Sequence, residues 1–197
     1  MQDNPPFESF IRGYMLDHEL VDQLLEMYAK APSQFKNPGQ QYGNQKAKKS
    51  TDLVLTPAKE RYTPVVGKYI SFVEQCMNDY INDFEILKVN NNLKLLETFN
   101  IQHYKKEEGF FNWHCEFMPG EHPVNDRVLV FMTYLQDIDN AGTEFLYQNI
   151  TTKSVKGLTL LWPAYFTHAH KGQISAVNEK TIVTGWLSHD RNDTANK

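Results

Sequence analysis

The chain of 197 residues is poor in cysteine, in excess positive charge and in long apolar runs. Its two cysteines, Cys76 and Cys115, are too few for a disulfide framework and do not form a CxxC metal-binding pair. Acidic residues outnumber basic ones by 24 to 20, and the formal net charge of −4 disfavours a nucleic-acid partner, which needs a basic face. No apolar segment is long enough to span a bilayer, so we expect no membrane partner.

The first six residues, Met1–Pro6, have neither the basic nor the apolar region of a secretory signal peptide. Two unpaired thiols also fit a reducing compartment. We therefore expect a soluble, cytoplasmic protein. The content of 41% hydrophobic and 22% charged residues is typical of a folded globular protein, and the length favours a single domain over residues 1–197.

The hydrophobic pattern changes along the chain. Apolar residues recur at spacings of three and four over Leu16–Ala31 and Thr63–Ile81, which predicts two helices. In the second half, short apolar or alternating runs between turn residues predict strands. These runs cover 95–104, 127–135, 143–147, 157–162 and 181–187. We expect an α+β fold, with a helical half over about 1–92 and a β-rich half over about 93–190.

A polar, turn-rich segment, Ser33–Ser50, separates the two predicted helices. Segments of this length without regular structure are uncommon in compact domains and often form functional lids. Two interpretations stay open. The segment either closes over a substrate, which Phe35, Tyr42 and Lys46–Lys49 would contact, or it is a solvent-exposed loop.

His114 and Glu116 are the pair most suggestive of chemistry. If they lie on a strand, residues i and i+2 share a face, so we expect His114 and Glu116 side by side and Cys115 pointing into the core. His168 and His170, which follow a predicted strand, each offer a third ligand. Two histidines and one carboxylate form the facial triad of non-haem Fe(II) oxygenases. The alternative is a set of hydrogen-bonded core histidines.

Further residues keep a characteristic order around this pair. They are Tyr104, Gly109, Arg127, Tyr134-Leu135-Gln136-Asp137, Gly142-Thr143-Glu144-Phe145, Lys180 and Trp186. Lys180 follows His170 by ten residues and His168 by twelve. In order, spacing and residue type, Leu95–Leu187 resembles the catalytic core of the Fe(II)/2-oxoglutarate-dependent dioxygenases. Within them it resembles the prolyl 4-hydroxylase-like branch. The spacing of ten residues matches that family, so the resemblance selects His170 over His168.

This resemblance implies a double-stranded β-helix (jelly-roll) core that the N-terminal helices buttress. It implies that His114, Glu116 and His170 hold Fe(II), with no catalytic residue beyond the metal site. The residues that it implies for binding the cosubstrate 2-oxoglutarate are Tyr104, Thr143, Lys180 and Trp186. Arg127 and Tyr134 are candidates for contact with the substrate. A surface position for Arg127 and a core position for Tyr134 are the alternatives.

The activity that the resemblance implies is hydroxylation of a C–H bond with O2 and 2-oxoglutarate, releasing succinate and CO2. A peptidyl proline or an amino acid would be the substrate, and ascorbate is an open candidate for an accessory cofactor. Glu116 departs from the family, which usually has Asp, but it keeps the carboxylate, so hydroxylation rather than halogenation is expected. Two other functions stay open: a non-catalytic cupin-like binding module, and a zinc-dependent hydrolase that uses the same His/Glu/His site.

Overall fold

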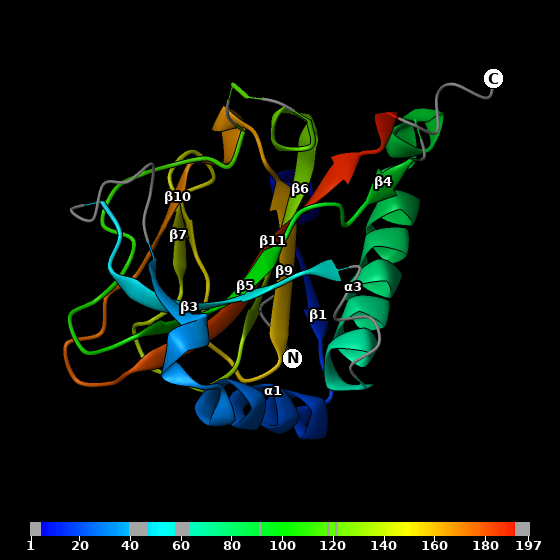
Figure 1. Cartoon of the computed structure of the whole chain (residues 1–197). Coiled ribbons are helices and arrows are strands. Elements are labelled where there is room, and N and C mark those ends of the chain that lie inside the picture. The colour runs from blue at the N-terminus through cyan, green and yellow to red at the C-terminus, as the bar shows by residue number, and fades with distance from the viewer. Residues whose placement is uncertain are drawn as a thin grey trace.

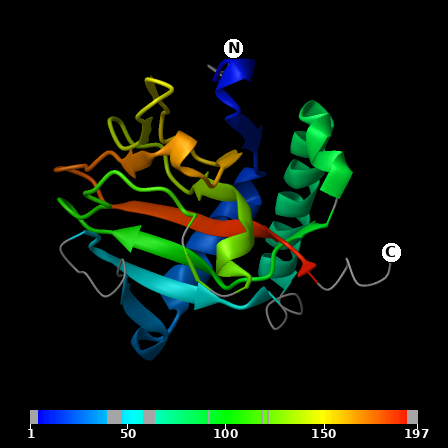
Figure 2. The same cartoon turned by 90° about the horizontal axis from the view of Figure 1, so that it is seen from above.

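A large antiparallel sheet forms the centre of the molecule (Figure 1). The computed structural model describes residues 5–39, 47–57, 64–90, 92–117, 119–120 and 122–191. The strands lie in the order β1-β9-β6-β11-β5-β3-β2, and β4 pairs with β11. Their bounds are β1 (Arg12–Met15), β2 (Lys36–Gly39), β3 (Ser50–Leu55), β4 (Leu93–Lys94), β5 (Phe99–Tyr104), β6 (Arg127–Tyr134), β9 (Leu158–Pro163) and β11 (Lys180–His189). Figure 2 shows β11 in red, β5 in green and β3 in cyan side by side.

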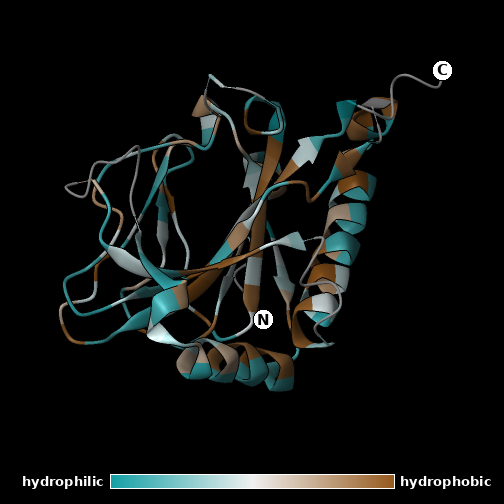
Figure 3. Cartoon of the chain, viewed as in Figure 1, coloured by the Kyte–Doolittle hydropathy of each residue, from teal (hydrophilic) through white to brown (hydrophobic). Residues whose placement is uncertain are grey.

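Two helices cover one face of this sheet. The first, α1 (His18–Lys30), begins after Asp17, whose side chain accepts the backbone N–H groups of Glu19 and Leu20 at 2.9 and 3.3 Å. The second is α3 (Pro64–Asp83), and the residues that it buries recur at helical spacing. These are Val66, Tyr69, Ile70, Val73, Cys76, Tyr80 and Ile81. Both helices share one buried apolar cluster with the large sheet, whose central strands are mostly brown in Figure 3.

A small three-stranded sheet packs against the other face. Its order is β10-β7-β8, and its strands are β7 (Thr143–Phe145), β8 (Ile150–Thr151) and β10 (His170–Gly172). Figure 1 shows this sheet on the opposite side of the large sheet from α3. Apolar side chains from both sheets, such as Phe145 and Ile182, form a second buried cluster between them. The two facing sheets form the jelly-roll core that the sequence predicts.

Short 3₁₀ turns connect several of these elements. Their bounds are η1 (Phe7–Ser9), η2 (Ser33–Phe35), η3 (Glu85–Asn90), η4 (Val124–Asp126) and η5 (Phe166–His168). None of the helices in the described ranges is both long enough and apolar enough to cross a membrane.

The predicted helices and the second-half strands agree with the structure in place and type. The helix expected over Leu16–Ala31 is α1, and the one expected over Thr63–Ile81 is α3, with Thr63 itself outside the described residues. Each of the predicted strand runs overlaps one of β5, β6, β7, β9 and β11. The three-residue strand β10 is too short to produce a periodic signal in the sequence.

The expectation that the first half is helical is wrong in part, because β1, β2 and β3 all join the large sheet. Strand β3 escapes notice because its inner face carries polar Ser50 and Asp52, which hide the alternation of apolar residues. The predicted loop Ser33–Ser50 contains η2 and β2. Tyr42 and Lys46, which were expected to contact a substrate, lie outside the described residues.

Gly185 in β11 lies very close to both neighbouring strands of the large sheet. A Cβ at this position would lie 2.4 Å from Cζ of Phe131 and 2.6 Å from Cβ of Phe99, so the two neighbouring strands leave no room for a methyl group. Gly185→Ala should therefore lower the free energy of unfolding by about 1–3 kcal/mol, as measured by urea denaturation. Gly120→Ala is the matched control, because its Cβ would lie 3.7 Å from its nearest neighbour. An unchanged urea midpoint for Gly185→Ala would contradict this packing.

Candidate metal centre and its cavity

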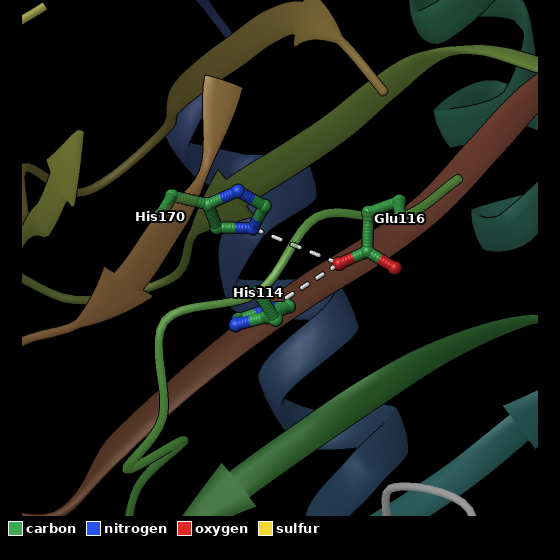
Figure 4. A group of neighbouring side chains, drawn as sticks. All are labelled: His114, Glu116 and His170. Atoms are coloured by element: carbon green, nitrogen blue, oxygen red, sulfur yellow. Dashed lines mark ion pairs between the residues drawn. The ribbon is translucent and has the colours of Figure 1, made fainter. Parts of the chain in front are cut away.

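Three side chains point at one another between the two sheets (Figure 4). His114 and Glu116 come from the segment after β5, and His170 opens β10. Nε2 of His114 lies 3.3 Å from Oε1 of Glu116, and Nε2 of His170 lies 3.6 Å from the same oxygen. One ligand atom from each of the three lies within 4.8 Å of the others. These are the residues that the sequence predicts as metal ligands, and the fold brings them together.

Backbone hydrogen bonds fix the two histidines relative to each other. The N–H of His114 donates to the carbonyl of His170 at 3.0 Å, and the N–H of His170 donates to the carbonyl of His114 at 2.8 Å. The segment that carries His114 is thereby joined to the small sheet at this one bridge. Because a bridge sets both Cα positions, the separation of the two imidazoles follows from the fold itself.

The outer nitrogens of both imidazoles are also held. Nδ1 of His114 lies 3.1 Å from the carbonyl of Asn112, and Nδ1 of His170 lies 2.9 Å from the carbonyl of His168. A carbonyl only accepts, so each Nδ1 carries a proton, and in the neutral imidazole each Nε2 then presents its lone pair to the centre. Burial lowers the pKa of His170, and the neighbouring charge of His114 lowers it further. The neutral, metal-binding form of His170 is therefore favoured.

Glu116 is held by its second oxygen. Nε1 of Trp186 donates to Oε2 at 2.9 Å, and the Arg127 guanidinium donates to the Glu116 carbonyl at 3.1 Å. Arg127 itself lies 3.7 Å over the Trp186 ring and pairs with Glu97. Burial alone would raise the pKa of Glu116, but the imidazoles of His114 and His170, when their Nε2 atoms are protonated, outweigh this effect through hydrogen bonds and keep that pKa well below its ordinary value. The carboxylate is therefore ionised and oriented.

Two sequence expectations about this segment are wrong. His114 and Glu116 do not lie on a continuous strand, because the N–H groups of Glu116 and Phe117 both donate to the carbonyl of Ala164, which bends the chain. Cys115 therefore does not point into the core: it is half-buried and lines the same cavity as the metal group. The surface position considered for Arg127 is also wrong, since this residue is only 7% exposed.

His168 stands outside the metal group. Its Nε2 lies 2.9 Å from the carbonyl of Ser9, and its Nδ1 lies 3.0 Å from Oγ1 of Thr167. Both ring nitrogens are therefore engaged elsewhere. The structure agrees with the spacing argument that selected His170.

The metal group opens into a cavity of about 280 Å³. All six of the other predicted site residues line it, namely Tyr104, Arg127, Tyr134, Thr143, Lys180 and Trp186. The cavity also has polar lining residues that the sequence analysis missed: Asp52, Asn100 and Gln102. The pairing of β3 with β5, which no local pattern predicted, brings these three together. Lys48, one of the lysines considered for substrate contact, lines the cavity beside them.

Lys180 is a buried cation in this cavity. Its Nζ donates to the carbonyls of Ala141 and Gln173 at 3.1 and 2.9 Å, and no carboxylate pairs with it among the residues that the structure describes. Burial lowers the pKa of Lys180 to about 8. An ammonium group held in this way is suited to an incoming anion, because a carboxylate would supply the missing opposite charge.

Three hydroxyl groups lie in the same cavity. Tyr104 donates to Oε1 of Gln102 at 2.6 Å, and burial raises its pKa well above the ordinary value, so this hydroxyl stays protonated. The hydroxyls of Tyr134 and Thr143 lie 2.7 Å apart. Tyr134 was expected either to contact the substrate or to lie in the core. It is buried, and it also lines the cavity.

Comparison with known proteins shows which family this site resembles. Residues 99–188 match the family model of the 2OG-Fe(II) oxygenase superfamily. No curated protein is similar enough to the chain to count as a match. Among solved structures, the chain is similar to a prolyl 4-hydroxylase from Pseudomonas putida, at 15% identity and a TM-score of 0.70. That similarity covers 92% of this chain and 94% of the other.

Two further solved structures share the fold. One is a viral collagen prolyl hydroxylase from Paramecium bursaria Chlorella virus-1 in complex with 2-oxoglutarate, at 15% identity, a TM-score of 0.68 and coverage of 92% and 97%. The other is a prolyl hydroxylase from Trichoplax adhaerens with a peptide fragment of the hypoxia-inducible factor, at 13% identity, a TM-score of 0.65 and coverage of 96% and 88%. The jelly-roll fold and the resemblance to the prolyl 4-hydroxylase-like branch are confirmed.

Trp186 offers a test of how Glu116 is held. Trp186→Phe keeps an aromatic ring under Arg127 but removes the Nε1 donor to Oε2 of Glu116. Loss of such a supporting hydrogen bond should weaken Mn(II) binding about 10–100-fold, as measured by calorimetric titration. Trp113→Phe is the matched control, since Trp113 is 41% exposed and its ring contacts Lys171. Equal Mn(II) affinities in both variants would show that Glu116 needs no indole donor.

Proposed function

On the premise that residues 99–188 are a 2OG-Fe(II) oxygenase core, we propose that the chain is an Fe(II)- and 2-oxoglutarate-dependent dioxygenase. It would hydroxylate a C–H bond of a peptidyl proline or an amino acid and release succinate and CO2. One observation carries this proposal: the same cavity is lined by a three-ligand metal group and by a buried lysine for which the described residues supply no carboxylate partner.

The donor set fits Fe(II). His114, Glu116 and His170 present two neutral imidazole nitrogens and one ionised carboxylate, and a facial set of this kind leaves room for other ligands. Fe(II), when bound with 2-oxoglutarate and O2, supplies the oxidative decarboxylation and the C–H oxidation. The protein's part is to hold these groups in position.

The other cavity residues have separate tasks in this proposal. Lys180 would bind the distal carboxylate of 2-oxoglutarate, and the hydroxyl of Thr143 can add a hydrogen bond to it. Tyr104, whose single donor bonds to Gln102, would contact the cosubstrate through its ring. Trp186 and Arg127 act on Glu116, since both contact it directly. For these two residues we therefore propose a positioning role in place of the cofactor and substrate contacts expected from the sequence.

The alternatives fit the cavity less well. A cupin-like binding module does not require Lys180 and Thr143 to share a cavity with the metal group, yet they do. A zinc hydrolase needs no buried cation beside its metal. The similar solved structures include one with 2-oxoglutarate and one with a peptide, which supports a cosubstrate and a peptide or amino-acid substrate here. Ascorbate belongs to the proposal through the family resemblance alone, and a cytoplasmic location belongs to it through the two unpaired thiols.

Anaerobic titration of the protein with Fe(II) and 2-oxoglutarate tests the proposal directly. We expect a saturable visible charge-transfer band from the Fe(II)–2-oxoglutarate chelate. His114→Ala and His170→Ala should abolish this band, because each removes a ligand. His168→Ala should keep it, because both ring nitrogens of His168 bond outside the metal group. A folded protein that binds Fe(II) but gives no band would favour the hydrolase or the binding module.

The pKa of Lys180 makes a second prediction. Only the ammonium form attracts a carboxylate, and burial lowers the pKa of Lys180 to about 8. The affinity for 2-oxoglutarate should therefore be constant below that pH and should fall as the pH rises through and above it, by up to about tenfold per pH unit. Calorimetric titration of the Mn(II) protein between pH 6 and 10 measures this profile.

Lys180→Met should lower the affinity about a hundredfold or more and flatten the profile, since removing one partner of a buried charge pair costs about 3–5 kcal/mol. Lys171→Met is the control, because Lys171 is paired with Glu144 and partly exposed. A wild-type affinity that does not change with pH would argue against Lys180 as the anion-binding group.

A further inference from the structure

The cavity wall contains an ion pair that the proposed function does not use. Nζ of Lys48 lies 2.8 Å from Oδ2 of Asp52, and the two side chains are only 7% and 10% exposed. The hydroxyl of Ser50 donates to Oδ1 of Asp52 at 2.7 Å. Lys48 and Asp52 both line the cavity that contains the metal group.

The fold connects this pair to the metal group through Phe110. Lys48 forms a β-bridge with Phe110, whose ring stacks on His114 with 3.5 Å between the ring centroids and an angle of 9°. Flanking backbone bonds, from Lys49 to Gly109 and from Phe111 to Ala47, are each 2.9 Å. The segment that carries Lys48 is therefore joined directly to the residue whose ring stacks on a metal ligand.

Hydrogen-bonding capacity remains at the ion pair. The Lys48 ammonium has three donors, and one of them is used by Asp52. Each oxygen of Asp52 accepts one hydrogen bond and has a second lone pair. Unused donors on a cation therefore lie beside unused acceptors on an anion.

Gln102 extends this polar wall. It is the Cα partner of Asp52 across β3 and β5, so both side chains lie on the cavity face of the sheet. Its Oε1 accepts from Tyr104, which fixes the direction of its amide group. The amide NH2 of Gln102 then has two donors for which the described residues supply no acceptor.

Stability alone does not account for this pair. Burying two opposite charges costs so much solvation that apolar residues of equal volume stabilise a fold as well or better. A pair in a cavity wall is different, because a ligand can use the charges that the fold has already desolvated and oriented. The ligand that matches it carries one positive and one negative charge a few ångströms apart.

We propose that Lys48, Asp52 and Gln102 bind the zwitterionic head group of a free α-amino acid. This inference rests on the proposed function and selects the amino acid over the peptidyl residue as substrate. The α-carboxylate would take donors from Nζ of Lys48 and from the Gln102 amide, and the α-ammonium would donate to Asp52. The side chain would extend past Phe110 toward the metal group. A residue within a peptide has neither an α-ammonium nor an α-carboxylate group. It would displace water from the ion pair without supplying opposite charges in its place, which is unfavourable.

The test uses the wild-type protein loaded anaerobically with Fe(II) and 2-oxoglutarate. Each of the common L-α-amino acids is added in four forms: free, N-acetylated, as the amide, and with both ends capped. Binding is measured as the change in the chelate band. We expect at least one free amino acid to change the band saturably. Its singly capped forms should bind at least tenfold more weakly, and its doubly capped form at least a hundredfold more weakly.

Variants separate recognition from structure. In Asp52→Asn, the free amino acid should lose its advantage over the N-acetylated form, because the ammonium no longer has a counter-charge. In Lys48→Met it should lose its advantage over the amide. If either variant fails to fold, Gln102→Leu still tests the site, because it leaves both charges in place. It should weaken the binding of the ligand forms with a free carboxylate severalfold. Lys49→Met is the matched control, because Lys49 lies next to Lys48 but is 67% exposed.

The outcomes distinguish this inference from the function on which it rests. If the chelate band forms and capped or peptide ligands change it as strongly as free amino acids, the head-group site is wrong and the dioxygenase stands. A band that no free amino acid changes has the same meaning. Failure of the band to form in folded, Fe(II)-binding protein overturns the proposed function and this inference with it.

Discussion

The bridge between His114 and His170 is the interaction on which the site depends. Its two backbone hydrogen bonds join the segment after β5 to the small sheet, and they bring one ligand from each side of the cavity to the same point. A side chain alone could not set this distance, because an imidazole has two rotatable bonds. The metal group is therefore a consequence of how the two sheets meet, and its geometry is as stable as that contact.

The third ligand is positioned by different means. Glu116 lies where the chain bends around the carbonyl of Ala164, and its side chain has one rotatable bond more than the Asp usual in the family. Trp186 and Arg127 compensate for this freedom, since one holds the second carboxylate oxygen and the other holds the backbone carbonyl. Arg127 is in turn held by Glu97 and by the Trp186 ring. The longer ligand is thus accompanied by a network that restricts it.

The parts of the site that could be predicted from the sequence are those with a short spacing or a matching motif. His114 and Glu116 are two residues apart, and Lys180 is set by its distance from His170 and by the alternation along β11. Asp52 and Gln102 could not be predicted, because they meet only through strand pairing in which a polar strand from the first half joins β5. Lys48 was considered as a substrate contact in a loop, but its ion pair with Asp52 could not be predicted. Strand β3 has a polar inner face because it lines the cavity, and that same feature conceals it as a strand.

The charges of the cavity divide into two groups, which explains how one cavity could serve two ligands. Among the residues that the structure describes, Lys180 has hydrogen bonds only to carbonyl groups, so its charge can attract an anion. Lys48 and Asp52 neutralise each other, so the pair attracts or repels a singly charged ligand less than either residue would alone. A dianion such as 2-oxoglutarate gains more at Lys180, because there it meets a positive charge with no carboxylate beside it. A neutral zwitterion gains more at the ion pair, because each of its charges finds an opposite one. Under the proposed function, the arrangement of the lysines would therefore direct the cosubstrate and the substrate to different parts of the cavity.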